Sequence, residues 1–211
     1  MMQGTQVNPN LSTGQVHGQM NHGGHEVFDV HEVLSGTIGT LNLYMLLRQH
    51  VKDPELRDMM DRHYQFILDE YNLTCECFKT GQKPSKRTES YMMKQDNQFT
   101  YGLKASQPKK PWQSPSEISD EFIAGSLLGA AKSAASMKTI AALESTNPVV
   151  RRVLAASVPN CIEMAYEISL YQNKHQYYQV PLLAQQDMQQ MLNMYAPAQG
   201  QPQWTQAGMV R

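Results

Sequence analysis

Glutamate and histidine are the residues of this sequence that could bind a catalytic metal ion. A di-metal centre inside a helical bundle needs a Glu from each of two helices and a Glu-x-x-His pair, one helical turn apart, from each of the other two. No such pair occurs, because the candidate glutamates are followed three residues later by Ser, Leu, Asn or Tyr. The glutamates concerned are Glu32, Glu70, Glu144, Glu163 and Glu167.

His63 lies on an apolar stripe, with Met60 rather than a glutamate three residues before it. We interpret it as a buried or boundary histidine whose ring nitrogens find hydrogen-bond partners. Glu32 and Glu144 lie on or beside apolar stripes and are either relics of a metal site or interhelical hydrogen-bonding partners. The sequence therefore predicts no catalytic, cofactor-binding or metal-binding residue, and no cofactor.

Two further groups of metal-ligating residues are weaker candidates. Cys75 and Cys77 face about 200° apart on a helix and cannot share a zinc ion. With Cys161 they are three cysteines, too few for a disulfide framework, which favours synthesis in a reducing compartment. Histidines near the N-terminus lie in a Gly-rich segment, where binding a metal would carry an entropic cost, so we expect a solvated tail. These are His17, His22, His25 and His31.

Length and charge exclude several other classes of protein. The 211 residues suffice for one domain with a sizeable core. With 18 Lys and Arg against 19 Asp and Glu, the chain lacks the basic excess of a nucleic-acid-binding protein. No apolar run approaches the 18 residues of a membrane span, and residues 1–10 lack the apolar core of a secretion signal.

Four long segments carry apolar residues at steps of three and four, the pattern of amphipathic helices. The first begins near His25. Asp53 and Asn147, each followed by Pro, are suited to cap the second and fourth. A capping box at 114–117 predicts the start of the third, and Pro159 predicts a kink in the fourth. The predicted fold class is all-α: a ferritin-like four-helix bundle built from two helical hairpins with a long crossover and disordered termini.

The predicted organisation places this bundle at residues 25–180, with the crossover at 81–113. The crossover carries an excess of basic residues and the first hairpin an excess of acidic ones, which indicates either a basic strap over an acidic hairpin or a solvated loop. Residues 181–195 form a short amphipathic helix that either folds back onto the bundle or docks another chain. The Gln-rich and Gly-rich tails, 1–24 and 196–211, are predicted to be disordered.

An internal repeat relates the two hairpins. The run DPELR at 53–57 matches NPVVR at 147–151 with an offset of 94 residues. At the same offset Leu34 corresponds to Leu128 and Met60 to Leu154.

Several strings in the second half resemble the Coat F family of bacterial endospore coat proteins: NPVVRR at 147–152, SVPN at 157–160, EMAYE at 163–167 and YQNKHQYYQVP at 171–181. The stretches GTIG at 36–39 and HVKDPEL at 50–56 are similar to a longer subgroup of that family. The resemblance covers about residues 20–195. It implies a ferritin-like fold without di-metal ligands. It also implies a structural, non-enzymatic component of the spore coat, made in the mother-cell cytoplasm and deposited on the developing spore.

Two alternatives remain: a metal-dependent ferritin-like oxidoreductase, which the missing Glu-x-x-His pairs disfavour, and a soluble helical interaction adaptor. The implied partners are other spore coat proteins and further copies of the chain, with no nucleic acid and no membrane span. Glutamine and lysine side chains are the two substrates of transglutaminase-type cross-links, and exposed tyrosines couple oxidatively. We therefore hypothesise covalent attachment through the Gln-rich C-terminal region and the Lys-rich crossover, against the alternative of tails that merely stay soluble. The glutamines concerned are Gln185, Gln186, Gln189, Gln190, Gln199, Gln201, Gln203 and Gln206.

Overall fold

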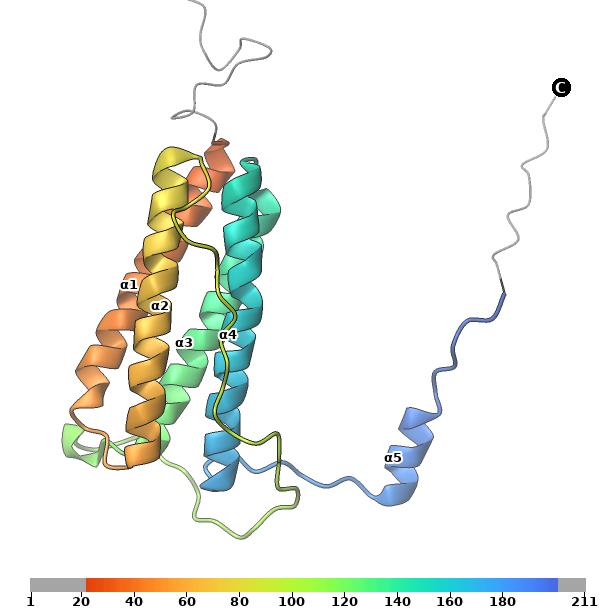
Figure 1. Ribbon diagram of the computed structural model, residues 1–211. Helices are drawn as coiled ribbons and strands as arrows, with labels where there is room; N and C mark the ends of the chain where they lie inside the picture. The colour runs from red at the N-terminus through yellow and green to blue at the C-terminus, as the bar shows by residue number, and fades with distance from the viewer. Residues whose placement is uncertain (1–21, 201–211) are drawn as a thin grey trace, which may run out of the picture.

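A computed structural model describes residues 22–200, which are helical apart from connecting segments and one parallel β-bridge between Tyr101 and Val180 (Figure 1). Four long helices form a bundle, and a fifth, short helix extends away from it. The predicted all-α class and four-helix bundle are confirmed. The helices are α1 (Gly24–Arg48), α2 (Pro54–Thr80), α3 (Asp120–Glu144), α4 (Pro148–Lys174) and α5 (Gln185–Leu192), with a 3₁₀ turn, η1, at Pro115–Glu117.

The order of the helices around the bundle follows from their contacts. Helix α1 packs against α2 and α3, and α4 packs against the same two helices. The hairpins α1–α2 and α3–α4 have short turns, whereas α2 and α3 run in the same direction and need a long connection (Figure 1). This crossover runs down the length of the bundle over α2 and α4 before α3 begins. It is the topology that ferritin-like bundles use.

Local sequence signals explain most helix ends. The Asp53 side chain accepts a hydrogen bond from the Glu55 N–H, and Asn147 accepts from the N–H groups at the start of α4. Gly81 ends α2 with a φ of 65°, in the left-handed region that glycine adopts without strain. The predicted caps at Asp53 and Asn147 are confirmed.

The predicted start of the third helix is wrong by one and a half turns. The capping box at Ser114 and Glu117 does form, but it caps only the 3₁₀ turn η1. Ile118 then takes an extended conformation with ψ near 129°, and Ser119 provides a second N-cap from which α3 begins at Asp120. Pro159, for which a kink is predicted, lies inside α4, which continues through this residue to Lys174.

The internal repeat is visible in the structure as two equivalent carboxylates, one in each hairpin. Each of them binds the turn of the other hairpin. Glu26, at the start of α1, accepts hydrogen bonds from the N–H groups of Thr146 and Asn147 in the α3–α4 turn, at 2.8 and 2.9 Å. Asp120 lies 94 residues after Glu26. It accepts from the N–H groups at 52 and 53 in the α1–α2 turn, both at 3.0 Å. Each hairpin thus holds the turn of the other, as expected for a pseudo-two-fold axis.

The core consists of two apolar clusters, one toward each end of the bundle. Large buried residues of the first cluster are Leu56, Met59, Ile123 and Tyr171, and the second contains Val30, Val150 and Leu154. Between them lies a layer of buried polar side chains: Glu70, Thr74, Lys138, Ser157 and Asn160.

The region after α4 leaves the bundle. All residues of α5 are exposed, so within the described residues this helix does not fold back onto the core (Figure 1). The predicted disorder of residues 1–24 and 196–211 falls largely outside the described residues, although Gly24 already belongs to α1. None of the helices between residues 22 and 200 combines the length and apolar character that a bilayer crossing requires.

The pseudo-two-fold carboxylates give a direct test of the fold. Replacing Asp120 by Ala leaves two backbone N–H groups of the α1–α2 turn without their acceptor, so we expect the free energy of unfolding to fall by about 1–3 kcal/mol. Chemical denaturation measures the change. Glu121→Ala is the matched control: its exposed ion pair with Lys109 contributes under about 1 kcal/mol. Equal losses from both variants would contradict the proposed role of Asp120.

Candidate functional site

A buried carboxylate on α4 lies at the centre of the polar side chains in the bundle. Glu167 is fully buried and accepts hydrogen bonds from Arg62 Nη2 at 2.8 Å and from Tyr91 Oη at 2.5 Å. His63 Nε2 lies 2.9 Å from its Oε2, and the backbone N–H of Lys94 donates to its Oε1 at 3.0 Å. Two donors come from α2 and two from the crossover, so this one carboxylate joins three parts of the chain.

The protonation state of His63 follows from its two neighbours. Its Nε2 faces the Glu167 carboxylate, which can only accept, and its Nδ1 lies 3.1 Å from the hydroxyl of Tyr44. A neutral ring with the proton on Nε2 satisfies both contacts, with the Tyr44 hydroxyl donating to Nδ1. Burial lowers the pKa of His63, against the opposing effect of Glu167. The interpretation of His63 as a buried histidine with satisfied nitrogens is confirmed.

For Glu167, unlike His63, the hydrogen bonds together affect the pKa more than burial does. Burial alone would raise it, since a charged carboxylate loses its hydration. Hydrogen bonds from His63, Arg62 and Tyr91 outweigh burial and hold the pKa of Glu167 well below its ordinary value. The carboxylate is therefore ionised at neutral pH, and the Arg62 guanidinium compensates its charge.

A second buried pair lies nearer the other end of the bundle. Lys138 of α3 donates to Glu70 of α2 at 2.7 Å, and Asn160 of α4 donates to the other oxygen of Glu70, also at 2.7 Å. Burial disfavours the charged ammonium, but the adjacent Glu70 carboxylate more than offsets this and raises the pKa of Lys138. A fixed ammonium thus compensates the charge of Glu70 in the interior of the bundle.

The crossover is held mainly by side chains of α4 that bind its backbone. Asn160 accepts from the N–H of Tyr91 at 2.9 Å and donates to the carbonyl of Glu89 at 2.8 Å. Asn173 makes the same two-sided contact with the N–H and carbonyl of Thr100, at 2.7 and 3.0 Å. Charge plays a smaller part, because the pair between Lys94 and Asp58 is exposed. The crossover is therefore fixed in register by buried amides.

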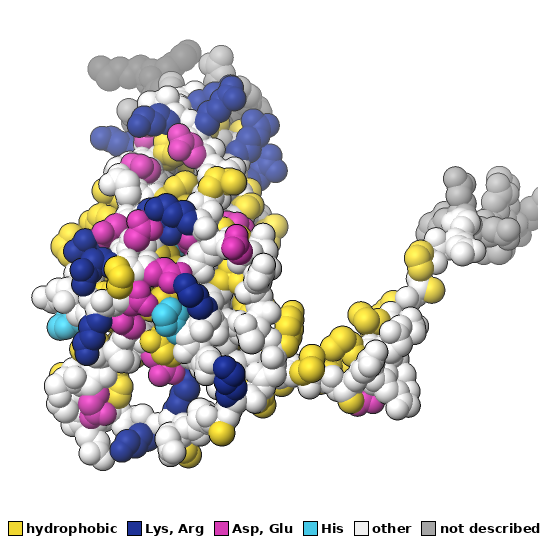
Figure 2. Space-filling model, turned by 60° about the horizontal axis from the view of Figure 1, so that its bottom comes forward, with side chains coloured by type: hydrophobic (Ala, Val, Ile, Leu, Met, Phe, Trp, Pro, Cys, Tyr) yellow, Lys and Arg dark blue, Asp and Glu magenta, His cyan; other side chains and the backbone are white. Residues whose placement is uncertain are grey.

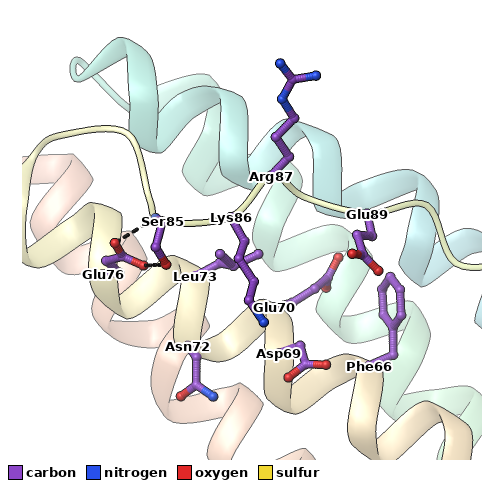
Figure 3. Close-up of a pocket in the computed structure, with 10 residues that line it drawn as sticks. All are labelled: Phe66, Asp69, Glu70, Asn72, Leu73, Glu76, Ser85, Lys86, Arg87 and Glu89. Carbon is purple, nitrogen blue, oxygen red and sulfur yellow. Dashed lines mark hydrogen bonds between the residues drawn. The ribbon is translucent and has the colours of Figure 1, made fainter.

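A groove lies between α2 and crossover residues 85–89 (Figure 3). At its edge, the Ser85 N–H and hydroxyl both donate to the carboxylate of Glu76. Arg87 points away from the groove. No histidine or cysteine lines it, and the Ser85 hydroxyl is held by the Glu76 carboxylate at 2.8 Å.

The other residues considered in the sequence are dispersed. Glu32 and Glu144 are exposed and do not meet His63. His22 pairs with Glu26 at 2.7 Å, while His17 lies outside the described residues. His25 and His31 are exposed, Cys75 is half-buried, and Cys77 and Cys161 are buried free thiols.

Sequence reasoning missed the partners of His63. The Glu-x-x-His spacing detects ligands on one helix and says nothing of donors on other helices, so it does not reveal that Glu167 contacts His63 or that Glu70 contacts Lys138. Tyr91 was also missed, because it lies in a loop-like segment with no periodic pattern. It is nevertheless buried against His63 and Phe66, with ring centroids 5.1 and 5.2 Å away.

Comparisons with known proteins point to one family. Residues 119–181, which contain α3, α4 and the segment after it, match the Coat F domain. The chain is 59% identical over 187 residues to a spore coat protein F-like protein, YhcQ, of Bacillus subtilis (strain 168). This alignment covers 89% of the chain and 86% of the relative. No solved structure matches the chain significantly.

The central carboxylate can be tested by a near-isosteric change. In Glu167→Gln an amide group faces the donors of Arg62, His63 and Tyr91, and the half-buried Arg62 guanidinium keeps only its exposed partner Asp58 as a counter-charge. We expect the free energy of unfolding to fall by about 3–5 kcal/mol. Glu163→Gln, one turn earlier on α4 and half-buried, changes it by no more than about 0.5 kcal/mol. Denaturation in guanidinium chloride compares the two, and similar losses would contradict the role given to Glu167.

The buried His63 predicts a pH dependence of stability. Its pKa is lowered in the folded state, so on acidification the unfolded chain takes up a proton near pH 6.5 while the folded ring stays neutral. Stability from this group is therefore present above about pH 6.5 and is lost as the pH falls toward the folded-state pKa. Between pH 7 and 5, the wild type should lose up to about 1.4 kcal/mol more per pH unit than His63→Gln. Parallel pH profiles would contradict burial of a neutral His63.

Proposed function

The chain belongs to the Coat F family of spore coat proteins, and we propose that it is a non-catalytic structural component of the coat. On this proposal it is made in the mother-cell cytoplasm and assembled onto the developing spore among other coat proteins. The observation that carries the proposal is the similarity to a spore coat protein F-like protein over most of both chains.

The interior of the bundle supports a structural role. The buried carboxylates Glu70 and Glu167 already accept hydrogen bonds from Lys138 and Arg62, and further donors complete their coordination. A carboxylate held in this way must give up a charged partner before it can bind a metal ion. The same contacts join α2, α3, α4 and the crossover. The two buried carboxylates therefore stabilise the arrangement of these four elements.

The surface supports attachment to neighbouring proteins. Hydrophobic side chains gather on the α5 region, outside the bundle (Figure 2). The six lysines of the crossover are exposed. Tyr101, Tyr178 and Tyr195 are exposed as well. We infer that α5 contacts other coat proteins and that glutamines and lysines in these regions form covalent cross-links there. The glutamines on α5 are Gln185, Gln186, Gln189 and Gln190, all exposed, whereas Gln201, Gln203 and Gln206 lie outside the described residues.

Fractionation of mature spores tests the structural role. An epitope-tagged full-length chain, expressed from its own promoter in a spore-forming bacterium, should be recovered in the coat fraction and seen over the coat by immunogold microscopy. Recovery only from the spore core or the mother-cell cytosol would overturn the proposal.

The cross-linking hypothesis predicts a separable effect. Changing all four α5 glutamines to Asn keeps the amides but shortens the side chains, which removes a transglutaminase substrate. We expect the fraction of tagged protein extractable from coats by detergent and reductant to rise at least about two-fold, an order-of-magnitude expectation for losing one attachment region. The matched control changes Gln49 and Gln65, exposed glutamines outside α5 and the crossover, to Asn. Peptide maps that recover all α5 glutamines unmodified would contradict the hypothesis.

A further inference from the structure

Outside the buried network, a histidine and two carboxylates meet where α2 begins and α4 ends. Ligand atoms of Asp53, Glu55 and His175 all lie within 4.8 Å of one another. The His175 Nε2 is 3.4 Å from Asp53 Oδ2, is shielded from solvent and has no hydrogen-bond partner. One nitrogen and two carboxylate oxygens in this arrangement form a donor set for a divalent first-row metal ion.

The surroundings fix the positions of these donors. The His175 ring packs against both Tyr171 and Tyr177, with ring centroids 4.3 and 5.5 Å away. The Tyr171 hydroxyl donates to Asp53 Oδ2 at 3.0 Å, which orients this carboxylate as an outer partner does around a metal ligand. The Glu55 carboxylate accepts from the Gln95 amide at 3.1 Å and from Lys174, which is 62% exposed and forms a pair of little energetic weight, so the Lys174 contact is the one that a metal ion can replace.

The internal repeat shows that the fold does not need this charged group. Under the pseudo-two-fold relation, the positions of Asp53 and Glu55 correspond to Asn147 and Val149, and that of His175 to Gly81. At that other end, Asn147 Nδ2 donates to the Gly81 carbonyl at 3.2 Å. A neutral hydrogen bond therefore suffices to join the start of one helix to the end of another. The three ionisable side chains exceed this structural requirement.

We propose that Asp53, Glu55 and His175 form a binding site for a divalent metal ion of the zinc type. Tetrahedral coordination at about 2.0 Å places ligand atoms about 3.3 Å apart, so ligand atoms that now lie within 4.8 Å of one another must approach by up to about 1.5 Å, with a water as fourth ligand. The bound ion joins the first turn of α2 to the end of α4, directly before the chain leaves the bundle toward α5. This site is separate from the bundle interior, and it departs from the sequence-based prediction that the chain has no metal-binding residue.

Calorimetric titration of the full chain with zinc chloride tests the site. His175→Gln removes the nitrogen ligand, whereas Asp53→Asn removes a charge and preserves the N-cap, as Asn147 does at the other end. We expect one zinc site to be lost in His175→Gln and to bind at least about ten-fold more weakly in Asp53→Asn. The matched control is His50→Gln, which removes an exposed histidine just after α1, at the same end of the bundle. This variant should titrate like the wild type.

Thermal unfolding supplies a second readout that zinc binding by the N-terminal histidines does not reproduce. Zinc chloride should raise the melting temperature of the wild type and of His50→Gln, since an ion bound only to the folded state stabilises it. Zinc chloride should leave the melting temperature of His175→Gln unchanged. Identical titrations and identical zinc-dependent shifts for the wild type and His175→Gln would overturn the proposal, as would an equal loss in His50→Gln.

Discussion

The structure depends on Glu167, a single carboxylate held entirely inside the bundle. Removing such a charge from water costs several kcal/mol unless it is paired and hydrogen-bonded. The required donors lie on α2 and on the crossover, at Arg62, His63, Tyr91 and the backbone of Lys94. Any shift of α4 against α2, or of the crossover along them, leaves this charge unpaired. We infer that the contact fixes the register of the three elements more than it adds net stability.

The same constraint relates the fold to its proposed role. Bundles with this long crossover can hold metal ions between facing carboxylates. Here Lys138 and Arg62 supply the positive charge, so Glu70 and Glu167 are neutralised by side chains that belong to the chain itself. Such an interior is complete as soon as the chain has folded. This property is what a structural protein requires, and it leaves the surface, including α5, for contacts with neighbours.

The two hairpins have kept their mutual contacts but have diverged in chemistry. Glu26 and Asp120 bind opposite turns in equivalent ways, because each must satisfy backbone N–H groups at a helix start. The side chains that join one helix end to another differ between the two ends of the bundle. At one end the contact is made by the neutral amide of Asn147, and at the other end a charged group surrounds Asp53. A duplicated scaffold thus allows one end to change while the other preserves the fold.

The sequence alone determined the four long helices and most of their ends, because periodic apolar residues and caps such as Asp53, Asn147 and Gly81 act within one or two turns. It also determined the family, and it indicated that His63 is buried. It could not determine which side chains His63 and Glu70 contact, since Glu167 and Lys138 lie on other helices, 104 and 68 residues away. The placement of Tyr91 and of His175 beside Asp53 likewise has no local signal. Only tertiary packing decides these contacts, because they are made when distant segments are brought into register and their buried polar groups must find partners.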